Sequence, residues 1–167
     1  MATRKKQPQP TGRPPISWQK QRWAFAFLLR NKDCALQARD KLTSAIFTST
    51  EKWLLTIWTV VDNYLQESSR LPSKALLVDL LNDYLTINPA AIDADDGPRV
   101  NEFLAFAFAI DDESLQDTKA AMTWLRQFLE DRMVDQVRAE LSTGQTPLQL
   151  SAAFSSLSSI SASLAGL

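Results

Sequence analysis

The sequence contains no histidine, one cysteine and four glycines among its 167 residues. Without histidine it lacks the usual general base, the commonest zinc ligand and the side chain whose charge changes near neutral pH. The single cysteine, Cys34, excludes an intramolecular disulfide and a thiolate metal cluster, and it is consistent with a reducing compartment. We predict that Cys34 is a buried structural thiol; the alternative, a nucleophile, would need a base beside it.

Motifs of catalysis are also missing. The chain has no GxxxxGK[ST] phosphate-binding loop and no GxSxG motif. The acidic run at 93–97 fails as a calcium loop, because its glycine is fifth rather than sixth and a leucine stands at the twelfth position. Two carboxylate pairs, Asp79 with Asp83 and Asp131 with Asp135, lie one helical turn apart, but no third ligand type accompanies them. We therefore predict a chain that is not an enzyme, with no catalytic residues, metal or cofactor.

Long hydrophobic runs are absent too. The longest apolar stretches, 24–29 and 103–110, are far shorter than the roughly 20 residues needed to cross a bilayer. The basic N-terminus is not followed by the apolar segment and small-residue cleavage site of a secretory signal. These observations predict a cytoplasmic protein that does not contact a membrane.

Charge is distributed unevenly along the chain. Residues 1–32 contain eight basic side chains and no acidic one, which leaves ten basic and 19 acidic residues in 33–167. Residues 1–16 hold four of the eight prolines and no apolar periodicity, so we expect a disordered tail. This tail has two interpretations: a solubilising leader, or a nucleic-acid arm. The arm would act through Arg4, Lys5, Lys6 and Arg13.

Residues 17–112 predict a globular head made only of helices. Ser17 is a candidate N-cap for a helix over 18–31, and a shorter helix over 34–43 would turn Leu36 and Leu42 inward. A further helix, apolar nearly all round and therefore central, should begin at proline 98.

The segment 48–85 predicts two amphipathic helices. Thr48 and Glu51 form a capping box at its start, after which apolar residues recur every three or four positions. Pro72 separates the first helix from a leucine-rich second one, and the short connection favours antiparallel packing.

Residues 113–167 predict a long helical hairpin. Its first helix should run from 113 to 141, more than twice the usual length, and end at Gly144; Thr146 and Pro147 then begin the second. One interpretation is that the apolar seam of the hairpin joins copies of the chain, and the other is that the hairpin folds back onto the head as core. The predicted oligomer interface comprises Met122, Leu125, Phe128, Leu129, Met133, Val137, Phe154 and Leu157.

The chain resembles the N-terminal domain of DnaB-type replicative DNA helicases, in the divergent form found in phage. The resemblance is carried by 42–81, LTSAIFTSTEKWLLTIWTVVDNYLQESSRLPSKALLVDLL, where a phenylalanine closes a short helix, a long helix follows, and a proline-led turn precedes a leucine-rich helix. A second piece, 122–160, is similar to the helical hairpin of that family, including Arg132 midway along its first helix. Together the match extends over roughly 18–165.

The resemblance implies an all-helical domain whose hairpins pair into dimers. Three dimers form the collar of a hexameric ring, on which primase or a helicase loader docks, while an ATP-driven motor lies beyond a linker helix. Because this sequence ends before any motor, we expect either a collar domain separated from its helicase or a stand-alone relative. The competing hypothesis is a helicase-loader or DNA-binding adaptor that acts through the basic tail.

Overall fold

The computed structural model describes residues 15–142, and everything below concerns this part of the chain. It consists of six α-helices and five short 3-10 turns without a β-strand among the described residues, which confirms the predicted all-α class. The helices are α1 (Trp18–Arg30), α2 (Lys32–Ala38), α3 (Lys52–Ser68), α4 (Lys74–Ile87), α5 (Gly97–Ala109) and α6 (Thr118–Ser142). The 3-10 turns are η1 (Ser44–Ile46), η2 (Ser49–Glu51), η3 (Pro89–Ala91), η4 (Ala94–Asp96) and η5 (Ser114–Gln116).

Side-chain caps fix where several helices begin. The Ser17 hydroxyl accepts from the Lys20 N–H at 3.4 Å, as predicted for the start of α1. Asn31 ends α1 and begins α2, because its own N–H donates to the Phe27 carbonyl while its side chain accepts from the Cys34 N–H. Asn31 therefore pairs one backbone carbonyl at the end of α1 and one backbone N–H at the start of α2.

The predicted capping box precedes α3. The Glu51 carboxylate accepts from the Thr48 backbone N–H at 3.4 Å, and the box nucleates the 3-10 turn η2, which runs directly into α3. Helix α3 ends at Ser68, and the capping residue Ser69 adopts a left-handed conformation with φ 57°. Ser73 then caps α4 by accepting from the Leu76 N–H, and α4 packs back along α3 as a helical hairpin.

Helix α1 is the centre of the fold. Its residues 24–29 are all at most 3% exposed, because α2, α5 and α6 cover it on different sides. The rings of Phe25, Phe47 and Phe128 meet there, with centroid separations of 5.2 to 6.3 Å, and join α1, the end of η1 and α6. The first half of α6 therefore belongs to the same core as the head.

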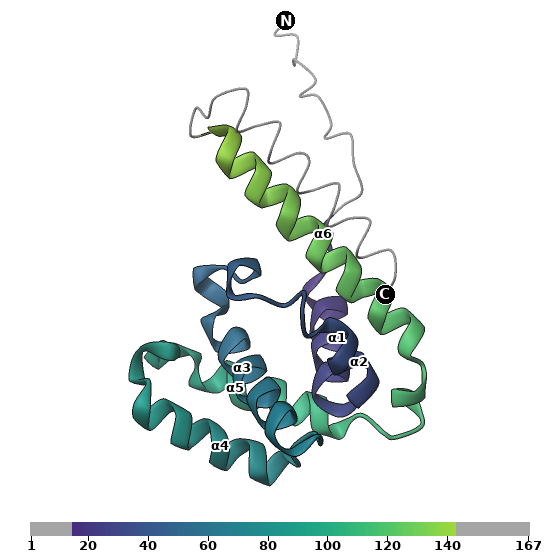
Figure 1. Cartoon of the computed structure of the whole chain (residues 1–167), viewed down its shortest axis with the longest axis vertical. Helices are drawn as coiled ribbons and strands as arrows, with labels where there is room; N and C mark the ends of the chain where they lie inside the picture. Colours follow the sequence, from purple (N-terminus) through teal and green to yellow (C-terminus); the bar gives the residue numbers. More distant parts are fainter. Residues whose placement is uncertain (1–14, 143–167) are drawn as a thin grey trace, which may run out of the picture.

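Helix α6 has two unlike halves. Its first half, up to Met133, lies on α1, while Figure 1 shows its second half extending beyond the other helices. In that second half Val134 and Leu141 are 39% and 42% exposed.

Two local predictions differ from the structure. The helix predicted over 34–43 ends at Ala38, and the prediction that Leu36 points inward was wrong, since this side chain is 44% exposed; Leu42 is buried as predicted. The long helix begins at Thr118 rather than 113. Residues 114–116 form a separate turn, because the Asp111 carboxylate accepts from the Ser114 N–H at 2.6 Å and the Asn31 side chain donates to the Leu115 carbonyl.

Within residues 15–142 no helix has the length and apolar character needed to span a membrane.

Candidate functional site

The groups that could support catalysis or metal binding are scattered in the described part of the chain. Between residues 15 and 142, no three acidic or cysteine side chains gather as a metal site. Cys34 is 1% exposed, and burial, with a smaller effect of Asp33, raises the pKa of its thiol to about 11. A thiol with this pKa is protonated at neutral pH. The low exposure of Cys34 confirms the prediction that its thiol is buried. Asp79 and Asp83 are exposed on α4.

A hollow of the surface lies between α1, the start of α3 and α5. It has a volume of about 380 Å³, which is in the range of pockets that hold a small ligand or a peptide side chain. Its lining combines four aromatic rings with four charged side chains. The lining residues are Trp18, Gln21, Arg22, Thr50, Glu51, Trp53, Arg99, Glu102, Phe103 and Phe106.

Aromatic rings form one wall of this pocket. Trp53 is buried and stands edge-on to Trp18 on one side and to Phe103 on the other, at centroid distances of 5.9 and 5.8 Å. Trp18 is 46% exposed, so part of its ring system remains in contact with water beside the pocket. Exposed tryptophan next to a preformed pocket is typical of protein-interaction surfaces.

The pocket also holds a buried polar group without a partner in the described part of the chain. The Arg22 guanidinium lies over the Phe106 ring at 4.2 Å, and its buried Nε–H finds no acceptor within the described chain. Arg22 forms no ion pair with any residue between 15 and 142. The neighbouring Gln21 also lines the pocket and is 7% exposed. Arg99, by contrast, is paired with Asp96 at 3.3 Å.

Two smaller hollows continue along α1 from the same place. One, of about 250 Å³, is lined by Trp23, Phe106, residues 109–111 and Ser114. The next, of about 240 Å³, lies between Trp23 and Trp124 at the start of α6. Neighbouring hollows share a lining residue, Phe106 or Trp23, and we call the three hollows together the α1 groove. Trp23 itself stands edge-on to Phe106 at 5.3 Å.

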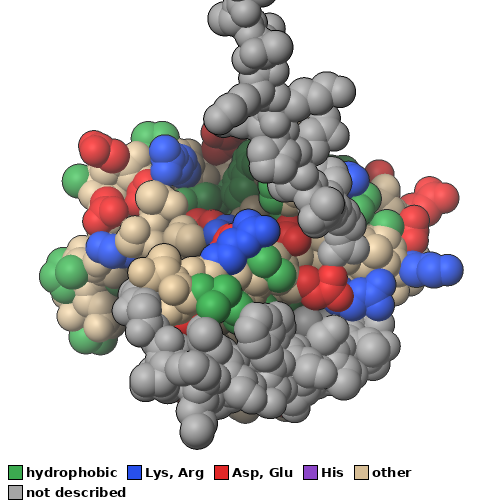
Figure 2. All heavy atoms as spheres, turned by 90° about the horizontal axis from the view of Figure 1, so that it is seen from above, with side chains coloured by type: hydrophobic (Ala, Val, Ile, Leu, Met, Phe, Trp, Pro, Cys, Tyr) green, Lys and Arg blue, Asp and Glu red, His purple; other side chains and the backbone are tan. Residues whose placement is uncertain are grey.

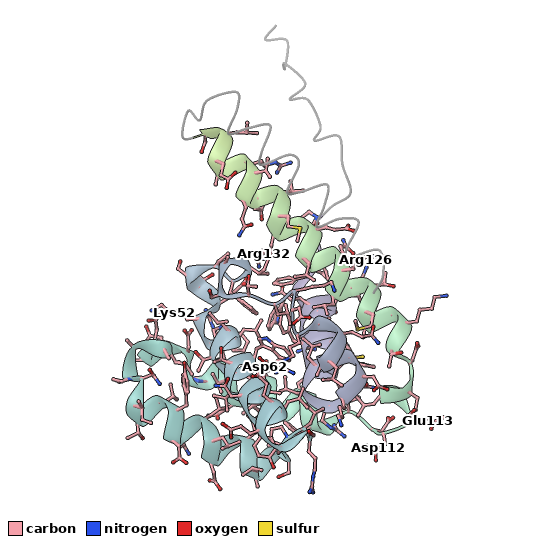
Figure 3. The ribbon with its side chains drawn as sticks, in the orientation of Figure 1. Lys52, Asp62, Asp112, Glu113, Arg126 and Arg132 are labelled. Carbon is pink, nitrogen blue, oxygen red and sulfur yellow. The ribbon has the colours of Figure 1, made fainter. Side chains whose placement is uncertain are left out.

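Polar contacts fasten α6 beside the first pocket. The Arg132 guanidinium donates to the Glu51 carboxylate, the same group that caps η2, and both side chains are largely buried. In Figure 3, Arg132 points from α6 toward the segment that precedes α3. Gln136 adds a bond to the Ala45 carbonyl at 2.7 Å, and Asp131 accepts from the Ile16 N–H at 2.9 Å. Glu51 is thus neutralised within the protein.

The structure places most of the predicted oligomer interface inside the chain. Between residues 121 and 133 the apolar seam of α6 packs on the head. Contact of this seam with a second copy of the chain stays a prediction. Phe154 and Leu157 lie outside the described residues, and Val137 is half-buried on the second half of α6. The seam residues buried in the core are Met122, Leu125, Phe128, Leu129 and Met133.

The predicted nucleic-acid residues Arg4, Lys5, Lys6 and Arg13 also lie outside the described part. On the face that Figure 2 shows, basic and acidic side chains are interspersed and no continuous basic patch is visible. The sequence analysis did not predict the groove. The signal that could have shown it is the density of tryptophan and arginine in 18–30 without a single acidic residue.

No protein-family model, curated protein or solved structure matches the chain.

Proposed function

We propose that this chain is a non-catalytic protein-interaction and oligomerisation domain, of the kind that forms the collar of DnaB-type replicative DNA helicases. In this function copies of the chain assemble through α6 as a dimer or hexamer, and the assembled domain offers a surface to primase or to a helicase loader. The observation that carries the proposal is the division of α6 into a half anchored in the head and a half that extends beyond it with apolar side chains exposed.

The arrangement of the segments that carry the resemblance supports this proposal. Phe47 follows a short turn, α3 is the long helix after it, and Pro72 precedes the leucine-rich α4. The ion pair of Arg132 with Glu51 joins the two resembling segments, because one residue comes from each. A helix held in this way is a rigid support for a contact outside the head.

The two exposed apolar residues lie on one face of α6. Val134 and Leu141 are seven residues apart, which is two turns, so they project on the same side of the helix. An apolar stripe on a helix that leaves its domain is a common route to association between helices. We therefore place the contact between copies beyond Met133 and not in the buried first half.

The test is the mass of the full chain in solution at about 20 µM, measured by light scattering after size-exclusion chromatography. We expect a multiple of the 18.7 kDa protomer. The double variant Val134→Glu with Leu141→Glu should be monomeric and keep its helical circular dichroism. Leu36→Glu is the matched control, because Leu36 is equally exposed but lies on α2.

A strictly monomeric wild-type chain at tens of micromolar would refute assembly. If Leu36→Glu dissociated the assembly as fully as the double variant, the contact between copies could not be assigned to α6. Deleting 113–167 is a poorer test. It would take Phe128 and its neighbours out of the core and unfold the head for reasons unrelated to assembly.

A further inference from the structure

The first pocket of the α1 groove carries an unsatisfied positive charge in an aromatic setting. Arg22 stacks on Phe106 at 4.2 Å, is partly buried, and has no carboxylate partner within residues 15–142. A charge that has lost part of its hydration without gaining a partner is costly, so an arriving carboxylate is favoured more strongly here than at an open surface. Guanidinium groups also match carboxylates geometrically.

The other charges of the pocket do not cancel this preference. Glu51 is engaged by Arg132, and Arg99 by Asp96. Glu102 is exposed at the rim, where water screens it. The locally unpaired and partly buried group is therefore Arg22, and it selects an anion.

The aromatic residues that line the rest of the pocket favour a ligand in which an apolar side chain accompanies the anionic group. Trp18, Trp53 and Phe103 provide rings in edge-on contact, and Trp18 leaves nearly half of its surface to be covered. The nearly buried Gln21 amide offers a donor and an acceptor that fit a peptide backbone. A volume of about 380 Å³ is large enough for one aromatic or branched side chain.

We propose that the first pocket of the α1 groove binds an acidic, aromatic-containing segment of a partner protein, with a carboxylate of that segment on Arg22 and its aromatic side chain against the rings of Trp18, Trp53 and Phe103. The adjoining hollows at Trp23 and Trp124 receive the flanking apolar residues of the same segment. This proposal is independent of assembly through α6, since none of the groove residues lies beyond Met133.

Nucleic acid fits this pocket less well. Phosphates would meet a single unpaired arginine with Glu102 beside it, whereas nucleic-acid sites present several cations along the backbone path. The residues 15–142 carry 14 basic and 19 acidic side chains, which also disfavours a polyanion.

The experiment uses the full chain and three capped pentapeptides labelled with fluorescein, measured by fluorescence polarisation. The acidic probe is Asp-Glu-Phe-Leu-Asp, the neutral isostere is Asn-Gln-Phe-Leu-Asn, and the basic counterpart is Lys-Arg-Phe-Leu-Lys. We expect the acidic peptide to bind about tenfold more tightly than the neutral one, which corresponds to one charged hydrogen-bonded contact. The basic peptide should bind most weakly.

The matched variants are Arg22→Gln and Lys20→Gln, which each remove one positive charge from α1. Lys20 is exposed and does not line the pocket. Arg22→Gln should abolish the preference for the acidic peptide, while Lys20→Gln should keep it. Circular dichroism checks that both variants fold, and Arg22→Lys provides a second variant that keeps the charge but loses the planar fork.

The position of the bound peptide is determined independently from the indole N–H signals of the wild-type protein in NMR spectra. Trp18 and Trp53 should shift on addition of the acidic peptide, and Trp58, buried in α3 away from the pocket lining, should not. Equal binding of the three peptides, tighter binding of the basic one, or displacement of the acidic peptide by single-stranded DNA would each overturn the proposal. So would an acid preference that survives Arg22→Gln. Collar assembly is unaffected by any of these outcomes, because it is measured as mass.

Discussion

Arg30, the last residue of α1, donates a hydrogen bond through Nη1 to the carbonyl oxygen of Ala107 in the last turn of α5, at 3.0 Å. The same nitrogen donates to the Ile110 carbonyl at 2.9 Å, and Nη2 pairs with Asp112 at 3.2 Å. The final carbonyls of a helix have no partner inside it and carry the negative end of its dipole. Arg30 therefore serves as the C-terminal cap of α5, supplied by a residue 77 positions away in sequence.

Replacing Arg30 by methionine should lower the free energy of unfolding by about 1–3 kcal/mol, because it leaves carbonyl groups of α5 without a donor. Urea unfolding followed by circular dichroism measures the change. Lys119→Met is the control: Lys119 is an exposed cation on α6, and its replacement should change stability by less than about 0.5 kcal/mol. Equal effects of the two variants would show that Arg30 contributes no cap.

The Glu51–Arg132 pair should show energetic coupling between α6 and the capping box. The single variants Glu51→Gln and Arg132→Gln and the double variant form a cycle, and we expect a coupling of about 1 kcal/mol for a largely buried, charged hydrogen bond. Arg132→Gln should be the more damaging single change, because it leaves the largely buried Glu51 carboxylate without its guanidinium, whereas a glutamine at 51 can still accept from the Thr48 N–H. Additive single effects would mean that the two groups act independently.

Local signals in the sequence were sufficient for most of the helices and insufficient for the surface. Ser17 and the pair Thr48 and Glu51 act within a few residues, so the starts they predict form as expected. Leu36 shows the limit: its apolar character suits a core position, but α2 is short and that face meets no neighbour. The α1 groove depends on where α5 and α6 stop covering Trp18 and Trp23, a tertiary property that periodicity does not encode.

Phe128→Ala should destabilise the whole described fold by about 3–5 kcal/mol, because this ring is 1% exposed and its loss leaves a cavity against Phe25 and Phe47. Val134→Ala on the same helix should cost less than about 0.5 kcal/mol, since its side chain is exposed. Chemical unfolding of both variants measures the contrast. A small effect of Phe128→Ala would mean that α6 is not part of the head core.

The adaptor alternative makes a prediction about salt. If Arg4, Lys5, Lys6 and Arg13 each neutralise one phosphate, log K for single-stranded DNA should fall with log salt at a slope of about −3. Changing these four residues to glutamine should then flatten the slope, and titrations between 50 and 200 mM salt measure it. Absence of binding by the wild-type chain at the lowest salt would remove the DNA arm from consideration.

Cys34 should make stability and reactivity depend on alkaline pH. Because burial raises the pKa of its thiol from its ordinary value of 9.0 to about 11, the fold favours the protonated form. The contribution of the Cys34 thiol to the free energy of unfolding is complete below pH 9. It is lost as the pH rises from 9 toward 11, because in this range the thiol ionises in the unfolded chain before it ionises in the folded protein. Only the thiolate attacks Ellman's reagent. With a pKa of about 11 in place of 9.0, the thiolate fraction of Cys34 at pH 8 is about 100-fold smaller in the folded protein than in the unfolded chain. Native protein should therefore react at least that much more slowly than protein in guanidinium chloride, and a native rate close to the unfolded rate would contradict the buried state of Cys34.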